Sequence, residues 1–306
     1  MKKIKIFSMK SPYREAFHIS GYVFGGGEKS VAIVGAMRGD EVQQQFVCSQ
    51  LVRILGGLER DGMLADGKEI LVIPSANHFS MNIGKRFWPM DNTDINRMFP
   101  GYDQGETTQR IASAIFERIK DYKSGIQLAS YHFAGDFILH VRVIKTAIDI
   151  SGGAQMFGLP YVYIKQPEPF DTVMLNYNWQ IWDTAAYSIY AGTTDTIDKN
   201  AAKQTWQAII RFLSESGIVR KEAAPGFKSK ILYDSDFTTV SAPCAGIFYQ
   251  LKHPGGDVRR SETIAKILDP YDGSVLSEIA SPRDGIIFFS HSKPLIMEKT
   301  VAFWVI

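Results

Sequence analysis

Arg38 and Glu41 are the first residues in this chain whose types and spacing could do chemistry. They lie three residues apart, after the apolar run 31–34 and before a long amphipathic helical pattern. A glutamate offers lone pairs to a cation, whereas an arginine is always protonated and offers only hydrogen-bond donors. The two could form a plain ion pair, and Arg38 could also place a fixed positive charge that binds an anion. Glu41 alone could be a first-turn acid that favours the helix dipole.

The elements that must position these residues follow an α/β pattern, because strand-like and helical periods alternate up to about residue 217. The predicted strands are 68–73, 126–131, 161–164 and 185–190, the run 137–144 is also apolar, and helical patterns cover 107–120 and 199–216. Such alternation predicts a mixed, largely parallel sheet flanked by helices, with ligands near the carboxyl ends of the strands. His132, at the end of one predicted strand, is therefore favoured as a site residue over a core histidine.

The pattern changes near residues 223–226. Beyond them come short β-prone runs broken by Pro and Gly, at 244–251, 263–268, 274–279, 285–289 and 301–306. No helical period is present there, so this part predicts a small all-β module. We predict two domains, an α/β domain over residues 1–228 and a β domain over residues 229–306.

Composition and charge limit the possible functions. The 306 residues are 45% hydrophobic and 22% charged, as in an ordinary soluble globular protein. The net charge of +2 is spread along the chain and gives no basic stripe for nucleic acid and no polybasic anchor for a membrane. No apolar run approaches the ~18 residues that span a bilayer, and no signal-peptide core follows the basic start. We therefore expect a cytoplasmic protein that binds neither nucleic acid nor a membrane. The oligomeric state stays open, and a homo-oligomer is one option.

Several segments, in order, resemble the succinylglutamate desuccinylase/aspartoacylase family of zinc carboxypeptidase-like hydrolases. Residues 34–41 resemble the loop whose His-x-x-Glu pair supplies two zinc ligands, and residues 128–132 resemble the strand ending in Asp-x-His, which supplies the third. Residues 94–100 (Asp-Ile-Asn-Arg-Met-Phe-Pro) resemble an Asp-Leu-Asn-Arg-x-Phe-Pro block and are the most specific element. Other segments match at 73–77, 84–86, 139–142, 187–192 and the tail from 241. The resemblance covers nearly the whole chain and implies a zinc carboxypeptidase/phosphorylase-hydrolase-like fold with a C-terminal β barrel-sandwich domain.

The resemblance implies an amide hydrolase with one zinc ion. Catalytic zinc takes three protein ligands and lowers the pKa of its bound water to about 7. At the matching positions Glu41 and His132 would bind the metal, with His78 or His140 as replacement ligands. Either of these two histidines could equally be a polar residue of the pocket wall.

The same resemblance implies a small carboxylate-bearing substrate, such as an N-acyl amino acid or a short peptide. A guanidinium fork matches a carboxylate in geometry and charge. The residues that would hold this carboxylate are Asn96, Arg97, Arg142 and Arg86. Read without the resemblance, Asn96 and Arg97 could be a turn with a solvated charge.

Three positions depart from the family pattern. Arg38 replaces the first zinc histidine, Ser130 replaces the aspartate beside the third ligand, and Tyr190 replaces the catalytic glutamate. A tyrosine with a pKa near 10 is a poor base at neutral pH, so Tyr190 would line the pocket or donate a proton. Asp195 or Asp198 could supply a displaced carboxylate, although a helix N-cap is the favoured role.

The departures leave three functional hypotheses. In the first, the protein is a zinc-dependent amide hydrolase in which Arg38 and Tyr190 take altered catalytic roles. In the second, it is a metal-free protein on the same fold that binds an anion or carboxylate through Arg38, Arg97 and Arg142. In the third, the same pocket carries out a different reaction with Tyr190 as the proton donor. Zinc content of the purified protein would discriminate between the first two.

Overall fold

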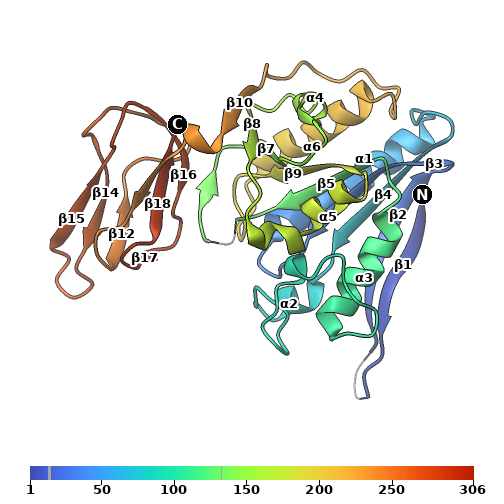
Figure 1. The fold of residues 1–306 in the computed structure, drawn as a ribbon, viewed down its shortest axis with the longest axis horizontal. Coiled ribbons are helices and arrows are strands. Elements are labelled where there is room, and N and C mark those ends of the chain that lie inside the picture. The colour runs from blue at the N-terminus through green and yellow to red at the C-terminus, as the bar shows by residue number, and fades with distance from the viewer. Residues whose placement is uncertain (13–14, 132) are drawn as a thin grey trace. The chain divides into compact units, whose positions relative to one another are not determined.

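The chain is described from a computed structural model, which covers residues 1–12, 15–131 and 133–306. These residues form two compact units (Figure 1). Unit 1 consists of Met1–Ser130, Leu139–Ala191 and Asp195–Ile231, and unit 2 consists of Tyr131–Ile138, Gly192–Thr194 and Leu232–Ile306. Unit 2 therefore includes two short segments from earlier in the chain as well as the C-terminal part. His132 lies outside the described residues.

Unit 1 contains most of a nine-stranded sheet with the order β1-β2-β4-β3-β5-β9-β7-β8-β10. The strands are β1 (Lys2–Met9), β2 (Phe17–Gly25), β3 (Glu28–Ala36), β4 (Lys68–Ser75), β5 (Ser124–Ala129), β7 (His140–Ile144), β8 (Tyr161–Lys165), β9 (Ala185–Tyr190) and β10 (Lys230–Tyr233). The neighbours β4, β3, β5 and β9 are parallel, as are β7 and β8. The pairs β1–β2, β2–β4 and β7–β9 are antiparallel. The prediction of a mixed, largely parallel sheet is confirmed.

Helices cover both faces of this sheet. On one face, α1 (Val42–Arg60), α4 (Ser151–Gln155) and α6 (Lys199–Glu215) bury side chains in a first core. On the other face, α3 (Thr107–Ile119) and α5 (Leu175–Ile181) contribute to a second core. Successive residues of a strand point to opposite faces, and a strand covered on both sides therefore reads as one continuous apolar run. In β3, Val31 and Ile33 join the first core, whereas Ala32 and Val34 join the second.

Short helices occupy the loops between these elements. They are α2 (His78–Asn82) and the 3-10 helices η1 (Ile95–Arg97) and η2 (Pro169–Val173). The Asp198 carboxylate caps α6, because its Oδ1 accepts hydrogen bonds from the main-chain N–H groups of Asn200 and Ala201 at 2.8 and 3.0 Å. The favoured N-cap role in this acidic pair is therefore confirmed for Asp198.

Unit 2 is built from antiparallel sheets, as the change of pattern near residue 226 predicted. One sheet has the path β11-β18-β16-β13 with β6 paired to β16, and the other has the order β15-β14-β12-β17. The strands are β6 (Asp136–Phe137), β11 (Thr238–Ser241), β12 (Gly246–Gln250), β13 (Asp257–Val258), β14 (Thr263–Leu268), β15 (Val275–Ala280), β16 (Gly285–Ser290), β17 (Leu295–Ile296) and β18 (Val301–Val305); one 3-10 helix, η3 (Asp234–Asp236), precedes β11. The apolar run 137–144 is not one element, since it is divided between β6 in unit 2 and β7 in unit 1.

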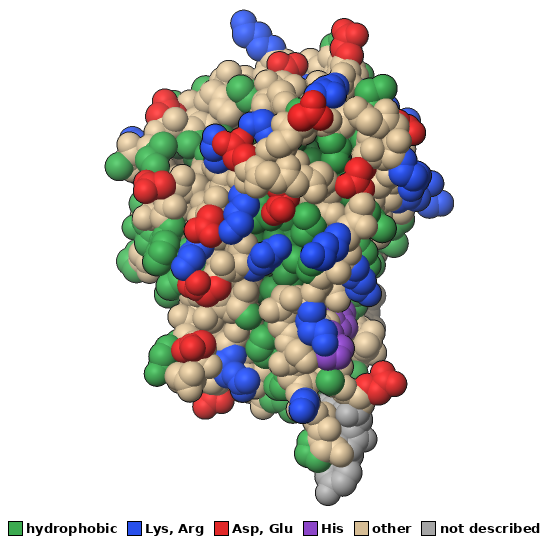
Figure 2. Space-filling view, turned by 90° about the vertical axis from the view of Figure 1, so that its right-hand side faces the viewer, with side chains coloured by type: hydrophobic (Ala, Val, Ile, Leu, Met, Phe, Trp, Pro, Cys, Tyr) green, Lys and Arg blue, Asp and Glu red, His purple; other side chains and the backbone are tan. Residues whose placement is uncertain are grey.

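Charged side chains of both signs occur on the surface of the protein (Figure 2). Figure 2 shows Lys and Arg side chains interspersed with Asp and Glu side chains on the face that it presents. Among the described residues, no helix is long and apolar enough to cross a membrane.

Candidate functional site

The loop between β3 and α1 brings Arg38 and Glu41 to the carboxyl end of the central strands. Gly39 lets this loop approach α2 closely, because a Cβ on that glycine would lie 2.1 Å from the main-chain oxygen of Lys85 and 2.6 Å from the Cβ of Ser80. The N–H of Gly39 also donates to the main-chain oxygen of Arg86 at 2.8 Å. The position of the loop is therefore fixed by backbone contacts that leave no room for a side chain.

The Arg38 guanidinium is buried, with 4% of its side chain exposed, and it bridges two carboxylates. Its Nε and Nη2 donate to Asp94 Oδ2 at 3.1 and 2.8 Å. Its Nη1 donates to Glu41 Oε1 at 3.1 Å and to the main-chain oxygen and hydroxyl of Ser130 at 3.3 and 3.2 Å. We call Arg38, Glu41, Asp94 and Ser130 the Arg38 cluster. It joins β3, η1 and β5 in one set of charge-assisted hydrogen bonds.

Glu41 has a full set of hydrogen-bond donors. Its Oε2 accepts the main-chain N–H groups of Met37 and Arg38 at 2.7 and 3.0 Å. Its Oε1 accepts Arg38 Nη1 at 3.1 Å and the Ser130 hydroxyl at 2.6 Å. A carboxylate offers about four lone-pair positions, so the donors in place account for all of them.

The electrostatics of the Arg38 cluster favour a permanently charged arginine. Burial acts to lower the pKa of Arg38, but the charges of Asp94 and Glu41 and their hydrogen bonds more than offset burial and raise the pKa above its usual range. The buried arginine lies against both carboxylates, and Arg97 places a second positive charge 3.7 Å from Asp94, so each buried charge has an opposite charge beside it. The cluster is therefore a closed ion network.

Tyr190 lies at the end of β9 in an aromatic and cationic stack. Tyr190 and His140 are cross-strand partners on β9 and β7, and their rings stack with centroids 4.7 Å apart and planes at 5°. The guanidinium carbon of Arg142 lies 4.8 Å from the centroid of the Tyr190 ring, within cation–π range. Burial raises the pKa of Tyr190, and the opposing charges of Arg142 and Arg38 do not cancel that effect. Tyr190 therefore keeps its proton at neutral pH and is a donor rather than a base.

Asn96 and Arg97 sit in η1, beside the Arg38 cluster. The Asn96 N–H donates to Asp94 Oδ1 at 3.1 Å, and its side-chain Oδ1 accepts Gln127 Nε2 at 2.8 Å. The Nε of Arg97 is 3.7 Å from Asp94 Oδ2, and 42% of its side chain is exposed. Asn96 is thus held in one orientation, while the guanidinium of Arg97 can reach a ligand from solvent.

Sequence reasoning missed the roles of Asp94 and Gln127. Asp94 was part of the most specific motif but was given no function, and here it holds both Arg38 and the N-terminus of η1. Gln127 gave a signal of its own, because it is a polar residue inside the buried run of β5. A buried amide in such a strand needs a partner, and that partner is Asn96.

The remaining predicted site residues have other partners. Arg86 forms an ion pair with Asp40. The His78 ring stacks on Phe17 with centroids 4.6 Å apart, and it lines a cavity of about 170 Å³ with Phe79 and Trp88. Burial lowers the pKa of His78, and the neighbouring charge of His18 lowers it further. The structure thus brings together Arg38, Glu41, Asn96 and Arg97 in one group and His140, Arg142 and Tyr190 in another.

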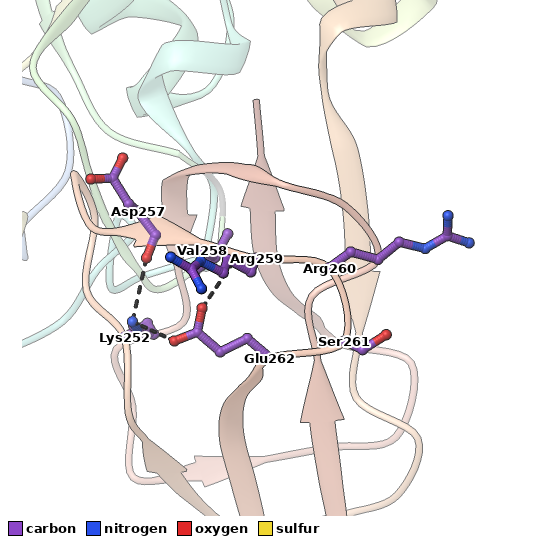
Figure 3. A pocket seen from close by; sticks show the side chains of 7 residues that line it. All are labelled: Lys252, Asp257, Val258, Arg259, Arg260, Ser261 and Glu262. Carbon is purple, nitrogen blue, oxygen red and sulfur yellow. Dashed lines mark hydrogen bonds and ion pairs between the residues drawn. The ribbon is translucent and has the colours of Figure 1, made fainter.

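A second hollow lies in unit 2 and has a volume of about 540 Å³. The Lys252 ammonium group in this hollow forms an ion pair with Glu262 at 2.6 Å and donates a hydrogen bond to the main-chain oxygen of Asp257 at 3.3 Å (Figure 3). Glu262 also accepts the Arg259 N–H at 2.9 Å, whereas the side chain of Arg260 points away from the others (Figure 3). The lysine and the glutamate that line this hollow are therefore paired with each other.

The sheet, its helices and the β unit define a class of α/β proteins that is known from solved structures. The crystal structure of a succinylglutamate desuccinylase from Silicibacter sp. matches with a TM-score of 0.84 and 18% identity over 99% of this chain and 92% of that one. The product-bound ectoine utilization protein EutE of Ruegeria pomeroyi matches with a TM-score of 0.79 and 18% identity over 95% of this chain and 89% of that one. At such identities the likeness establishes a shared fold.

The family follows from the sequence profile. The succinylglutamate desuccinylase/aspartoacylase catalytic domain matches residues 27–215, a span that contains every candidate site residue from Arg38 to Tyr190. This chain belongs to that family, and the resemblance drawn from its motifs is confirmed. The N-alpha-acetyl-L-2,4-diaminobutyric acid deacetylase of Halomonas elongata is 26% identical over 289 residues, covering 85% of this chain and 77% of the relative.

The family implies a zinc ion, and the described residues do not fit one at Glu41. A zinc ligand must present a free lone pair, whereas both oxygens of Glu41 accept two hydrogen bonds each. Among the described residues, which leave out His132, no group of three or more His, Cys, Asp and Glu side chains is placed to hold a metal ion. Metal binding by Glu41 and His132 therefore stays a prediction.

Proposed function

We propose that this protein is an amide deacylase that acts on a small carboxylate-bearing compound, an N-acyl amino acid or a short peptide. The observation that carries the proposal is the family match over residues 27–215, which spans all the strand ends where the site residues lie. The deacetylase of Halomonas elongata supports an amide as the bond cleaved.

Arg97, Asn96 and Arg142 would hold the carboxylate of the substrate. Arg97 has the exposure that a ligand-binding guanidinium needs. Asn96 presents its amide N–H₂ because its Oδ1 is already engaged by Gln127, and that N–H₂ can donate to a carboxylate oxygen. Arg142 lies against Tyr190 and would add a second positive charge.

Tyr190 would act as a proton donor, and Arg38 would act only as a fixed positive charge. Amide hydrolysis moves a hydroxyl from water to the acyl carbon and a proton to the leaving amine. Tyr190, protonated at neutral pH because burial raises its pKa, would give its proton to that amine and would regain the proton that the attacking water loses, so the tyrosine returns to its starting state. Arg38 would supply positive charge, and zinc dependence stays a separate proposal that the donor set at Glu41 does not favour.

Cleavage and binding should be measured together on the purified chain. The substrates are a panel of N-acetyl and N-succinyl amino acids and N-acetyl-diaminobutyrate, with release of free amine followed by mass spectrometry and binding by calorimetry. Arg97→Ala should weaken binding of the best substrate about 10- to 100-fold, because a hydrogen bond to a charged group contributes about 1.5–3 kcal/mol. Arg110→Ala, which removes an exposed arginine of α3, is the matched control and should change nothing.

The outcomes separate the hypotheses. Cleavage that depends on Arg97 supports the deacylase. Binding without cleavage would replace it with the metal-free carboxylate-binding protein, whose motivating observation is the closed Arg38 cluster. Neither binding nor cleavage across the panel would reject the substrate class. A small-molecule partner and a cytoplasmic location belong to the same proposal.

A further inference from the structure

We propose that the Arg38 guanidinium is a built-in cation that replaces the divalent metal at Glu41 and keeps such a metal out. This inference concerns how the site is assembled. It does not depend on which substrate is used or on whether cleavage occurs.

The Arg38 guanidinium lies directly against the Glu41 carboxylate. Its Nη1 lies 3.1 Å from Glu41 Oε1, on the oxygen that the Ser130 hydroxyl also contacts, while Oε2 is closed by two main-chain N–H groups. The main-chain donors belong to the loop itself and cannot move away without unfolding it. A metal could therefore reach Glu41 only by displacing Arg38 from Oε1.

Asp94 and Ser130 hold the Arg38 guanidinium in place. Asp94 accepts both Nε and Nη2 on one oxygen, and the main-chain oxygen of Ser130 accepts Nη1. Leaving Glu41 would break this geometry in a place where almost none of the side chain reaches water. The arginine thus has no solvated position that it could adopt in exchange.

The positive charge of Arg38 also opposes a metal ion at this position. One guanidinium faces two carboxylates, so the Arg38 cluster is already stabilised by opposite charges without a metal. A divalent ion entering beside an arginine that stays in place would meet a like charge at close range, where burial weakens screening. An arginine donates hydrogen bonds but accepts no metal, so it repels the ion and offers it no lone pair.

The test measures retained zinc and thermal stability in the full-length protein. Each protein is dialysed against micromolar zinc and then against metal-free buffer, and its zinc is measured by mass spectrometry. Its melting temperature is recorded with zinc and with a chelator. Arg38→His restores a His-x-x-Glu spacing with Glu41 and leaves His132 unchanged in the sequence. Arg110→His makes the same exchange at an exposed site on α3 and is the matched control.

The wild-type protein and Arg110→His should retain little zinc, and neither should change its melting temperature between zinc and chelator. Arg38→His should retain near-stoichiometric zinc and melt higher with zinc, and adding Glu41→Gln should abolish both effects. If the wild-type protein retains zinc and Glu41→Gln retains the same amount, that zinc is bound at another place. This result would agree with the proposal, which concerns only a metal at Glu41.

Two results would overturn the proposal. One is near-stoichiometric zinc in the wild-type protein that Glu41→Gln removes. The other is a folded Arg38→His variant, verified by circular dichroism, that gains no zinc. If that variant does not fold, the wild-type measurement with and without Glu41→Gln still decides. Because the readout is metal content, failure here leaves the deacylase proposal standing, and failure of the activity assay leaves this proposal standing.

Discussion

At the scale of single residues, Asp94 does more for the site than its place in a motif suggested. One of its oxygens accepts hydrogen bonds from the Arg38 guanidinium, and the other accepts the Asn96 N–H in η1. It therefore links the cation of the Arg38 cluster to the segment that carries Asn96 and Arg97. Removing its charge should affect both stability and ligand binding.

Asp94→Asn should lower the free energy of unfolding by about 3 kcal/mol, because it removes one partner of a buried charge pair. Urea unfolding followed by circular dichroism measures this change. Asp66→Asn is the control, since the pair that Asp66 forms with Arg220 lies in solvent with side chains 93% and 52% exposed; it should have little effect. An equal change in the free energy of unfolding for the two variants would mean that the buried pair contributes no more to stability than the exposed pair.

The raised pKa of Tyr190 predicts how the stability of the protein changes with pH. Burial raises its pKa in the folded chain above the ordinary value of about 10. The folded state then keeps a proton that the unfolded chain loses, so this contribution to stability is complete below about pH 10 and is lost as the pH rises through the folded-state pKa. Tyr190→Phe should therefore flatten the loss of stability above about pH 10.

Urea unfolding at about pH 8 and about pH 11 measures that slope. Tyr271→Phe, at a side chain that is 98% exposed, controls for the loss of a tyrosine hydroxyl and should keep the wild-type slope. An unchanged slope in Tyr190→Phe would show that Tyr190 ionises alike in the folded and unfolded states.

At the scale of elements, the loop from β3 to α1 is held by close backbone contacts of Gly39 as well as by the side chains of the Arg38 cluster. Gly39 lies against α2 and the segment that follows it, and its N–H is bonded to Arg86. The same loop supplies two main-chain donors to Glu41. Any displacement of the loop would therefore open the Arg38 cluster.

Gly39→Ala should displace this loop, because the new Cβ would meet a main-chain oxygen at 2.1 Å. We expect a loss of about 1–3 kcal/mol in unfolding free energy, the range for overpacking, together with weaker ligand binding. Gly26→Ala is the matched control, since nothing lies within 4 Å of its Cβ position. Chemical unfolding and calorimetric binding measure the two effects. A Gly39→Ala variant as stable as Gly26→Ala would contradict the assigned close approach.

At the scale of the whole molecule, unit 2 takes its aromatic residues from two distant parts of the chain. Phe137 in β6 pairs with Phe289 in β16. The rings of Tyr131 and Phe133 stack on each other at 5.4 Å, and each also contacts Trp304 at 5.0 and 5.6 Å. Segment 131–138 is thus part of the β unit, although the α/β pattern continues after it.

A chain ending at residue 231 should expose the aromatic side chains of this segment, because their partners lie in the missing part. We expect it to bind a hydrophobic dye more strongly and to aggregate more than the full chain. The same shortened chain with Tyr131, Phe133 and Phe137 changed to serine should lose most of that binding. Light scattering and dye fluorescence measure both effects, and equal dye binding by the two shortened chains would refute the assignment.

The sequence by itself determined the α/β class, the change to an all-β part, and the family, because these depend on periodicity and on motifs that are contiguous in the chain. It did not predict the strands β1 and β2 at one edge of the sheet. Segment 94–97 also marked Asn96 and Arg97 as ligand-binding candidates. It did not show that the run 137–144 serves two units, since an apolar run has the same appearance in either core.

Only the tertiary structure decided the partners of Arg38. An arginine three residues before a glutamate predicts an ion pair, and that pair is present. The second carboxylate comes from Asp94, and the Ser130 contacts come from the end of β5, both far along the chain. Long-range hydrogen bonds have no local pattern, because they depend on which strand ends the sheet places side by side. For that reason the sequence identified Arg38 as a departure from the family pattern, and only the fold showed that Arg38 joins Glu41, Asp94 and Ser130.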